Sequence, residues 1–392
     1  MQIRLMEDSF TEKEFIAVMN CLKSGEYTQG RLVEEFEKKF AEWNSSKYAV
    51  MVNSGSSANL LMAFMLKEYF GLKDGDEVIV PCVTWPTTIY PLIQNNLIPV
   101  LCDVDESFNL DLSSLQRMVS SKTKAVFLVH LLGQPARIAE IQQVCHEHKL
   151  ILLEDGCESL GAKYSGKKIG NFGVMGSFSF YFGHHLTTIE GGMITTDDFK
   201  LADLLKSARS HGWVRNSARK EFYPEFKTQY FLFDMLGYNL RSTNINAALG
   251  LAQLENLDNT IKIRSENHRY FLQRITELGW SGMGVKAQSV NLEESSSFSL
   301  ALLFKSQAER DHVLSHLPEK GIESRPIVAG NLLRQPVFKY ANLKADKTPQ
   351  ADLIHEQGIY LPNNQFMSKE KVDYMLDSIK ALLQGFHGKS WF

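Results

Sequence analysis

Short apolar runs in the first half of the chain constrain the fold most strongly. They span residues 77–81 (EVIVP), 99–104 (PVLCDV), 124–130 (KAVFLVH) and 150–155 (LILLED). Runs of this kind, apolar at nearly every position, are typical of parallel strands buried on both faces. Between two of them, residues 136–149 place apolar side chains at a period near that of a helix. The alternation predicts an α/β domain with a mostly parallel sheet flanked by helices.

The second half of the chain indicates a smaller α+β domain. Its pattern predicts one long helix or two joined helices over 244–278, a strand over 297–304, and helices over 310–321 and 369–385. We place the domain boundary near residue 250. The large α/β domain then covers 1–250, and the small C-terminal α+β domain covers 251–392.

Composition argues against several kinds of partner. The net charge is −3 over 392 residues, which gives no reason to expect nucleic acid or a membrane surface. Residues 1–15 carry charges throughout and do not resemble a signal peptide. No stretch approaches the roughly 18 apolar residues that a membrane span requires. We therefore expect a cytoplasmic protein.

A candidate phosphate site lies in residues 53–64 (NSGSSANLLMAF), where a glycine and several hydroxyl residues precede a helix. Free backbone N–H groups and the helix dipole attract phosphate at such an N-terminus. Gly55, Ser56 and Ser57 are the candidates, and the alternative is that a serine only caps the helix. The pattern is not a P-loop, because no lysine follows it.

Two further residues suggest the kind of ligand. Asp155 ends the apolar run 150–155, where a buried carboxylate is costly unless a positive group meets it. That group is either a lysine or arginine, or the protonated ring nitrogen of a cofactor. Trp85 follows the run 77–81 and either stacks on a flat ligand or belongs to the core. Together with a phosphate site, these residues indicate pyridoxal 5′-phosphate (PLP).

Four motifs in a fixed order then identify a family. They are NSGSSAN, EDGCESLGA, the SFSFYF strand followed by HH, TT and EGG, and residues 237–255 (GYNLRSTNINAALGLAQLE). With them the chain resembles the PLP-dependent nucleotide-sugar aminotransferases of fold type I, the DegT/DnrJ/EryC1 family. The resemblance covers nearly the whole chain. It implies the fold type I architecture, with a mostly parallel sheet and a smaller α+β C-terminal domain, and a homodimer.

The resemblance also implies roles for individual residues. Asp155 would pair with the pyridine nitrogen of PLP, and Trp85 would stack on its ring. Asn239 would reach the phosphate in the neighbouring subunit, so that the two copies share their active sites. The remaining expected cofactor contacts are Gly55, Ser56, Ser57, Ser159 and Ser179.

One position departs from the family pattern. The family's segment begins with lysine, whereas residues 184–192 read HHLTTIEGG and begin with His184. Imidazole has no primary amine and cannot hold PLP as a Schiff base, so an ordinary aminotransferase is not expected. Histidine at this position resembles the sugar 3-dehydratases of the family, which are lyases. They remove the C3 hydroxyl of a nucleotide-linked 4-keto-6-deoxy sugar.

Two types of such dehydratase are distinguished by their cofactors. One carries an iron–sulfur cluster on four cysteines, mostly in the second half of its chain. This chain has five cysteines and none after Cys157, so we expect no cluster and no metal. The other type needs only PLP, its amino form PMP, and L-glutamate, and the run FGHHLTTIEGGM resembles it. The implied substrate is GDP-4-keto-6-deoxy-D-mannose, with the GDP resting on resemblance alone. The implied products are a 4-keto-3,6-dideoxy sugar, 2-oxoglutarate and ammonia.

We expect His184 to carry the proton, because an imidazole pKa of about 6.5 suits both taking and returning one near neutral pH. Glu323 is a candidate to fix its tautomer, or it only pairs with a surface cation. His185 is expected to lie behind His184, because neighbours on an extended backbone point to opposite faces. His211 is a candidate for the sugar site and Arg215 for the diphosphate, although packing or surface roles also fit them.

Two alternatives stay open. The first is an aminotransferase that uses a different lysine, of which Lys163, Lys167 and Lys168 are nearest in sequence. The second is a relative without catalytic activity that binds PLP or a nucleotide sugar.

Overall fold

The computed structural model describes residues 1–215, 217–226 and 228–389. Its largest element in these ranges is an eight-stranded sheet of order β1-β9-β8-β5-β4-β2-β3-β13. The strands from β8 to β13 run parallel, while β9 is antiparallel to both of its neighbours. The strands are β1 Tyr48–Val52, β2 Glu77–Pro81, β3 Ile98–Cys102, β4 Thr123–Val129, β5 Ile151–Asp155, β8 Met175–Ser179, β9 Gly192–Thr196 and β13 Lys344–Ala345.

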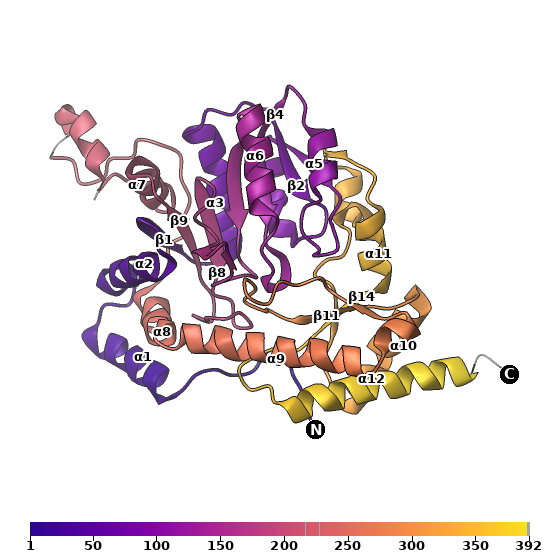
Figure 1. The fold of residues 1–392 in the computed structure, drawn as a ribbon. Helices are drawn as coiled ribbons and strands as arrows, with labels where there is room; N and C mark the ends of the chain where they lie inside the picture. Colours follow the sequence, from indigo (N-terminus) through magenta and orange to yellow (C-terminus); the bar gives the residue numbers. More distant parts are fainter. Residues whose placement is uncertain (216, 227, 390–392) are drawn as a thin grey trace.

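The four apolar runs form β2, β3, β4 and β5, as the sequence predicts. Two hydrophobic cores cover the two faces of the sheet. In β2, Val78 and Val80 belong to the core on one face, whereas Ile79 belongs to the core on the other. The strand is apolar at successive positions because both faces are covered, and Figure 1 shows helices packed around it.

The helices of the large layer belong to one core or the other. α3 (Gly55–Glu68) and α7 (Phe199–Ala208) pack in the core of Val78. α2 (Arg31–Asn44) and α6 (Ile138–His148) pack in the core of Ile79. The shorter or peripheral helices are α1 Glu12–Ser24, α4 Tyr90–Gln94 and α5 Leu112–Met118, and a small hairpin pairs β6 Lys163–Tyr164 with β7 Lys167–Lys168.

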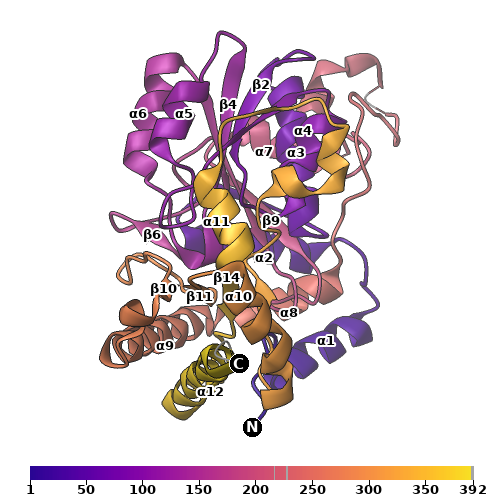
Figure 2. The same ribbon diagram turned by 90° about the vertical axis from the view of Figure 1, so that its right-hand side faces the viewer.

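The second half of the chain builds a smaller layer. The predicted long helix is two joined helices, α8 (Asn244–Leu254) and α9 (Leu257–Glu277). Figures 1 and 2 show α9 beside α12 (Lys369–Lys389), under a four-stranded antiparallel sheet of order β10-β11-β14-β12. Its remaining elements are β10 Lys286–Ala287, β11 Leu300–Leu303, α10 Gln307–His316, β12 Arg325–Pro326, α11 Pro349–Gln357 and β14 Gly358–Leu361.

The chain crosses between the two layers more than once. Ile3 forms a bridge with Ile322 in the small layer, and β13 returns to the large sheet beside β3. Ala351 and Ile354 of α11 pack in the core of Val78. The division of the chain near residue 250 stays a prediction. In the ranges described above, no helix combines the length and apolar character that crossing a membrane requires.

Candidate active site

A cavity of about 460 Å³ lies at the carboxyl ends of the parallel strands. Asp155 at the end of β5 and Ser179 at the end of β8 line it, with Trp85 from the loop after β2. Phe298 and Asn363 of the smaller layer complete the wall. Ligands gather at this edge of open α/β sheets, so the cavity is the candidate active site.

The N-terminus of α3 approaches this cavity closely. Ser54 caps the helix by accepting a hydrogen bond from Ser57 N at 3.1 Å, and Gly55 and Ser56 line the cavity. A Cβ on Gly55 would lie 2.6 Å from Cβ of Ser179, so only glycine fits there. The hydroxyl of Ser57 is already committed, because it donates to Asn53 Oδ1 at 2.6 Å. The first turn of α3 therefore offers an anion site built mainly from Gly55 and Ser56.

Asp155 is a buried carboxylate held by neutral hydrogen-bond donors. Only 5% exposed, it accepts hydrogen bonds from Asn59 Nδ2 at 2.7 Å, Thr88 Oγ1 at 2.8 Å and Cys157 N at 3.1 Å. No lysine, arginine or histidine of the described residues pairs with it. The pairing of Val129 with Asp155 across β4 and β5 fixes this position at the sheet edge. A ligand that brings its own positive charge fits the site better than a salt bridge does.

Trp85 is a wall residue and not a core residue. Its side chain is 57% exposed and lines the cavity at the start of a short 3₁₀ turn, Pro86–Thr88. An exposed indole beside a concave site is available for stacking. The core alternative for Trp85 therefore does not hold. Taken together, Asp155, the α3 N-terminus and Trp85 fit PLP.

His184 lies in a turn directly after β8. The backbone N–H of His184 donates to Tyr181 O at 3.0 Å. Its ring packs edge-on against the rings of Tyr181 and Phe298, with centroids 5.9 and 5.1 Å away. The ring lines the cavity, and its buried Nδ1 makes no hydrogen bond to the described residues. Burial, with a smaller contribution from the positive charge of Arg264, lowers the pKa of His184 to about 4. The imidazole of the ligand-free protein is therefore neutral near pH 7, and its pKa lies below the value of about 6.5 expected from the sequence because the ring is buried.

His185 points away from the cavity. Its Nε2 lies 2.9 Å from Ser296 O, and its ring is tilted against Phe298 at 5.7 Å. Burial lowers its pKa well below the usual histidine range. A turn, and not the expected extended backbone, separates the two imidazoles. His185 thus anchors the turn that carries His184.

Two predicted residues do not reach the cavity. Glu323 is exposed, and its carboxylate accepts the N–H of Leu5 at 2.9 Å instead of meeting His184. It therefore anchors the N-terminal segment, of which Leu5 lines the cavity. Ser159 is fully buried, donating to His130 O at 2.6 Å and accepting from Gly133 N at 3.0 Å. Its hydroxyl fastens the loop after β4 and has no bond left for a phosphate.

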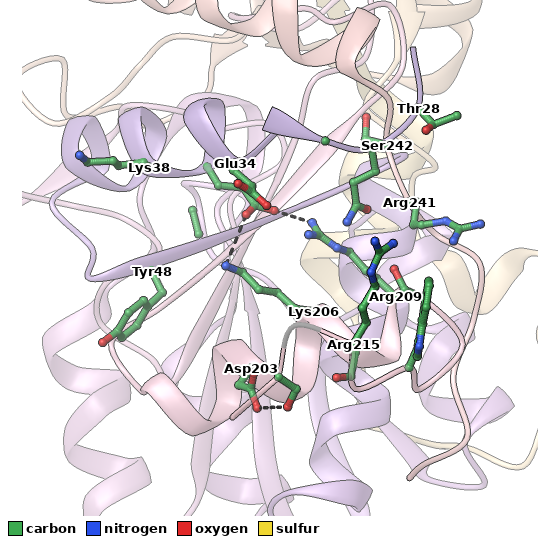
Figure 3. Close-up of a pocket in the computed structure, with 18 of the residues that line it drawn as sticks. Thr28, Glu34, Lys38, Tyr48, Asp203, Lys206, Arg209, Arg215, Arg241 and Ser242 are labelled. Atoms are coloured by element: carbon green, nitrogen blue, oxygen red, sulfur yellow. Dashed lines mark hydrogen bonds and ion pairs between the residues drawn. The ribbon is translucent and has the colours of Figure 1, made fainter. Parts of the chain in front are cut away.

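Three other predicted residues lie on a different face. Asn239 and Arg215 line a second cavity of about 1000 Å³, formed with α2, β1 and α7. Figure 3 shows Lys206, Arg209 and Arg215 close together in it. His211 is exposed nearby, and its backbone N–H donates to Tyr238 O at 2.7 Å. Within one copy, none of these side chains lines the cavity of His184.

Several wall residues were not among the sequence-based candidates. Burial, with a smaller contribution from the charge of Asp155, raises the pKa of Glu158 to about 7, although Leu132 N donates a hydrogen bond to its carboxylate at 3.1 Å, which acts in the opposite direction. Its place in the EDGCES motif, three residues after Asp155, is a signal that could have found it. Arg325 and Tyr360 line the cavity from β12 and β14, in segments with no motif around them.

No group of three or more possible metal ligands occurs among the described residues.

Residues 8–380 match the DegT/DnrJ/EryC1/StrS aminotransferase family. The chain belongs to this family. A relative from Escherichia coli O55:H7 named GDP-4-keto-6-deoxy-D-mannose 3-dehydratase is 37% identical over 388 residues, which cover 96% of this chain and 99% of the relative.

Solved structures in this family agree with the fold. The Escherichia coli enzyme of that name, with bound hydrated PLP, superposes with a TM-score of 0.91 at 36% identity, covering 97% of this chain and all of the other. A GDP-4-keto-6-deoxymannose-3-dehydratase with a trapped PLP–glutamate geminal diamine gives 0.88 at 36% identity and covers 96% of this chain and all of the other. The predicted fold class, a PLP-dependent aminotransferase fold with a smaller second layer, is thereby confirmed.

Proposed function

We propose that this protein is a PLP-dependent 3-dehydratase that acts on GDP-4-keto-6-deoxy-D-mannose with L-glutamate as amino donor. The observation that carries the proposal is the identity of residue 184. His184 lines the cavity after β8, where the family pattern has its lysine, and no lysine lines this cavity in the described part of the chain. The similar proteins that bear this activity in their names, and the glutamate adduct trapped in one of them, support the same substrate pair.

Different wall residues would bind different parts of the cofactor. Asp155 would accept a hydrogen bond from the protonated pyridine nitrogen, Gly55 and Ser56 would bind the phosphate, and Trp85 would stack on the ring. Once bound, PLP supplies an electron sink for the carbon atoms next to the reacting nitrogen. Because His184 has no amine, the cofactor is held without a covalent bond to the chain, and we expect it to be lost on dilution.

His184 carries the proton in both halves of the proposed reaction. Its neutral ring first takes a proton from the α-carbon of glutamate, and later gives one to the departing C3 hydroxyl of the sugar. Positioned acid–base groups of this kind accelerate a reaction by about 10²–10⁴-fold. The sugar loses one oxygen atom overall, and the oxidation of glutamate to 2-oxoglutarate and ammonia balances that loss.

The rival aminotransferase reading lacks a suitable lysine. Lys163, Lys167 and Lys168 lie on the β6–β7 hairpin and do not line the cavity. The ammonium group of Lys168 lies 3.6 Å from the ring centroid of Trp43, which holds it away from the site. A relative without catalytic activity that binds PLP would use Asp155 in the same way, so only turnover separates that alternative from the proposed enzyme.

Analysis of the products tests the proposal. The protein is incubated with glutamate and with GDP-, CDP- or TDP-linked 4-keto-6-deoxy sugars, and the products are weighed by mass spectrometry while ammonia is assayed. We expect the GDP-linked sugar to become lighter by one oxygen atom, with ammonia and 2-oxoglutarate released in equal amounts. An amino sugar without free ammonia would establish the aminotransferase instead, and no turnover of any sugar would favour a binding relative.

We further propose that two copies form a homodimer and share their active sites. The support is the place of Asn239 and Arg215, which line a cavity of their own, apart from His184 of the same copy. Mixing the strongly impaired His184→Asn and Asn239→Ala variants under exchange conditions tests this. Half of the random pairs would be mixed, each with one intact site, so activity should return to about a quarter of the wild-type level. No recovery of activity after confirmed exchange of subunits would contradict the sharing of active sites.

The cytoplasm stays the proposed location, which fractionation of expressing cells would test.

A further inference from the structure

A buried arginine lies directly behind the turn that carries His184. Arg264 is on α9, and only 3% of it is exposed. Its Nη1 donates to Phe298 O at 3.0 Å and to Asn363 O at 2.6 Å, and its Nη2 donates to His184 O at 3.5 Å. All three acceptors are backbone carbonyls. One guanidinium thus joins three segments that lie far apart in the sequence.

Each of the three segments contributes to the wall of the cavity, because His184, Phe298 and Asn363 all line it. The ring of Phe298 in turn packs edge-on against the imidazole of His184 at 5.1 Å. Arg264 therefore fixes both the backbone of His184 and the aromatic surface on which its ring lies. Asn363 closes the arrangement by donating from Nδ2 to Arg264 O at 3.1 Å and to Ser297 O at 2.8 Å.

The charge of Arg264 has no counter-ion among the described residues. Burial lowers its pKa to about 10, so the guanidinium still carries its charge at neutral pH. A buried cation paired only with carbonyl oxygens is a costly way to hold three loops together, because its desolvation is not offset by an opposite charge. Neutral donors would satisfy the same carbonyls at lower cost, which points to a role for the cation beside the imidazole.

We propose that Arg264 is a positioning residue for His184, which holds the turn and the ring of Phe298 so that the imidazole stays directed into the cavity. This inference rests on the proposed role of His184 as the proton carrier. The positive charge of Arg264 also opposes a second positive charge on the adjacent imidazole. His184 is thus held in one place in its neutral form between proton transfers.

Replacing Arg264 by methionine, which keeps an unbranched apolar stem but removes the guanidinium and its charge, tests the inference. We expect the rate of the half-reaction with glutamate to fall by about 10²-fold, at the lower end of what a positioned acid–base group contributes. The KM for glutamate and the dissociation constant for PLP should change less than about threefold, because Asp155, Ser56 and Trp85 do not contact Arg264. Arg264→Lys, which keeps the charge, should recover a measurable part of the rate.

The matched control lies on the same helix. Arg269 is largely exposed and bonded to Glu293 at 3.0 Å, so Arg269→Met should leave the rate unchanged. A readout that needs no turnover is the proton NMR spectrum of the ligand-free protein, with the His184 ring signals assigned by their loss in His184→Asn. They should be a single sharp set in wild type and in Arg269→Met, and broadened or doubled in Arg264→Met.

The double variant separates positioning from general damage. If Arg264 acts through His184, adding Arg264→Met to His184→Asn should cost less than about threefold in rate. A full further loss, or a fall in PLP affinity that matches the fall in rate, would overturn the inference. So would a wild-type rate in Arg264→Met. If His184→Asn itself keeps the wild-type rate, the proposed function of His184 fails, and that result is distinct from the others.

Discussion

Replacing Asp155 by asparagine should weaken PLP binding while changing the stability of the ligand-free protein only slightly. The change keeps the shape of the side chain and removes its charge. In the structure this charge faces Asn59, Thr88 and the backbone of Cys157 and meets no cation of the described residues. A carboxylate whose purpose is structural would have the opposite signature, with stability lost and cofactor affinity unaffected.

The magnitudes follow from these contacts. Asparagine keeps one oxygen as acceptor, and the hydroxyl of Thr88 can reverse its direction. The amide of Asn59 cannot turn as easily, because its Oδ1 accepts from Ser177 Oγ at 2.6 Å. The lost charged hydrogen bond, about 1.5–3 kcal/mol, is offset by no longer burying an unpaired charge. We expect a net stability change within about 1–2 kcal/mol, and PLP affinity reduced roughly 10- to 150-fold when the charged contact to the ring nitrogen is lost.

Thermal unfolding of the ligand-free protein and titration with PLP, followed by absorbance, measure the two quantities. The neighbouring carboxylate is the matched control. Glu154 is fully buried and accepts from the backbone of Gly170, Phe172 and Gly173, so Glu154→Gln should lower the melting temperature and leave the PLP affinity of the folded protein unchanged. If Asp155→Asn melts as early as Glu154→Gln and binds PLP as wild type does, the reasoning is refuted.

Two further predictions concern burial. Both ring nitrogens of His268 are buried without a partner in the described residues, and burial lowers its pKa to about 4. The unfolded chain then binds the proton more readily than the folded one, so the free energy of unfolding falls as the pH drops from about 6.5 to 4. At pH 4.5 the loss from this histidine is about 2–3 kcal/mol, and in urea denaturation His268→Leu should abolish it. An equal loss in acid for both proteins would contradict this prediction. A Cβ at Gly55 would lie 2.6 Å from Ser179 Cβ and 3.0 Å from Cys157 Sγ, so Gly55→Ala should shift the α3 N-terminus, cost about 1–3 kcal/mol and weaken PLP binding at least about tenfold. An unchanged PLP titration of that variant would show that this N-terminus is not the phosphate site.

The central strands and one side of the cavity could be predicted from the sequence because their signals are local. β2 to β5 are apolar at successive positions, and the residues that follow such strands must meet at one edge of the sheet. Asp155 and Trp85 were found in this way. His184 was found by a different signal, the replacement of a lysine within an otherwise intact family motif.

The other side of the cavity could not be predicted, because its contacts carry no residue-specific pattern. Arg264 binds backbone carbonyls, which every residue offers. Phe298 and Asn363 reach the cavity only after the smaller layer packs against the sheet. Ser159 was expected from the family resemblance and Glu323 as a carboxylate that could orient His184, but their side-chain oxygen atoms bond to backbone groups that folding brings beside them.

The central claim is that this protein works with a cofactor that no lysine holds. Incubation with PLP, reduction with borohydride and peptide mass spectrometry test it most directly. We expect no pyridoxyl group on any lysine of the wild-type protein, and cofactor that gel filtration removes, while the His184→Lys variant carries the group at that position and loses dehydration. A pyridoxyl-lysine in active wild-type protein would contradict the account.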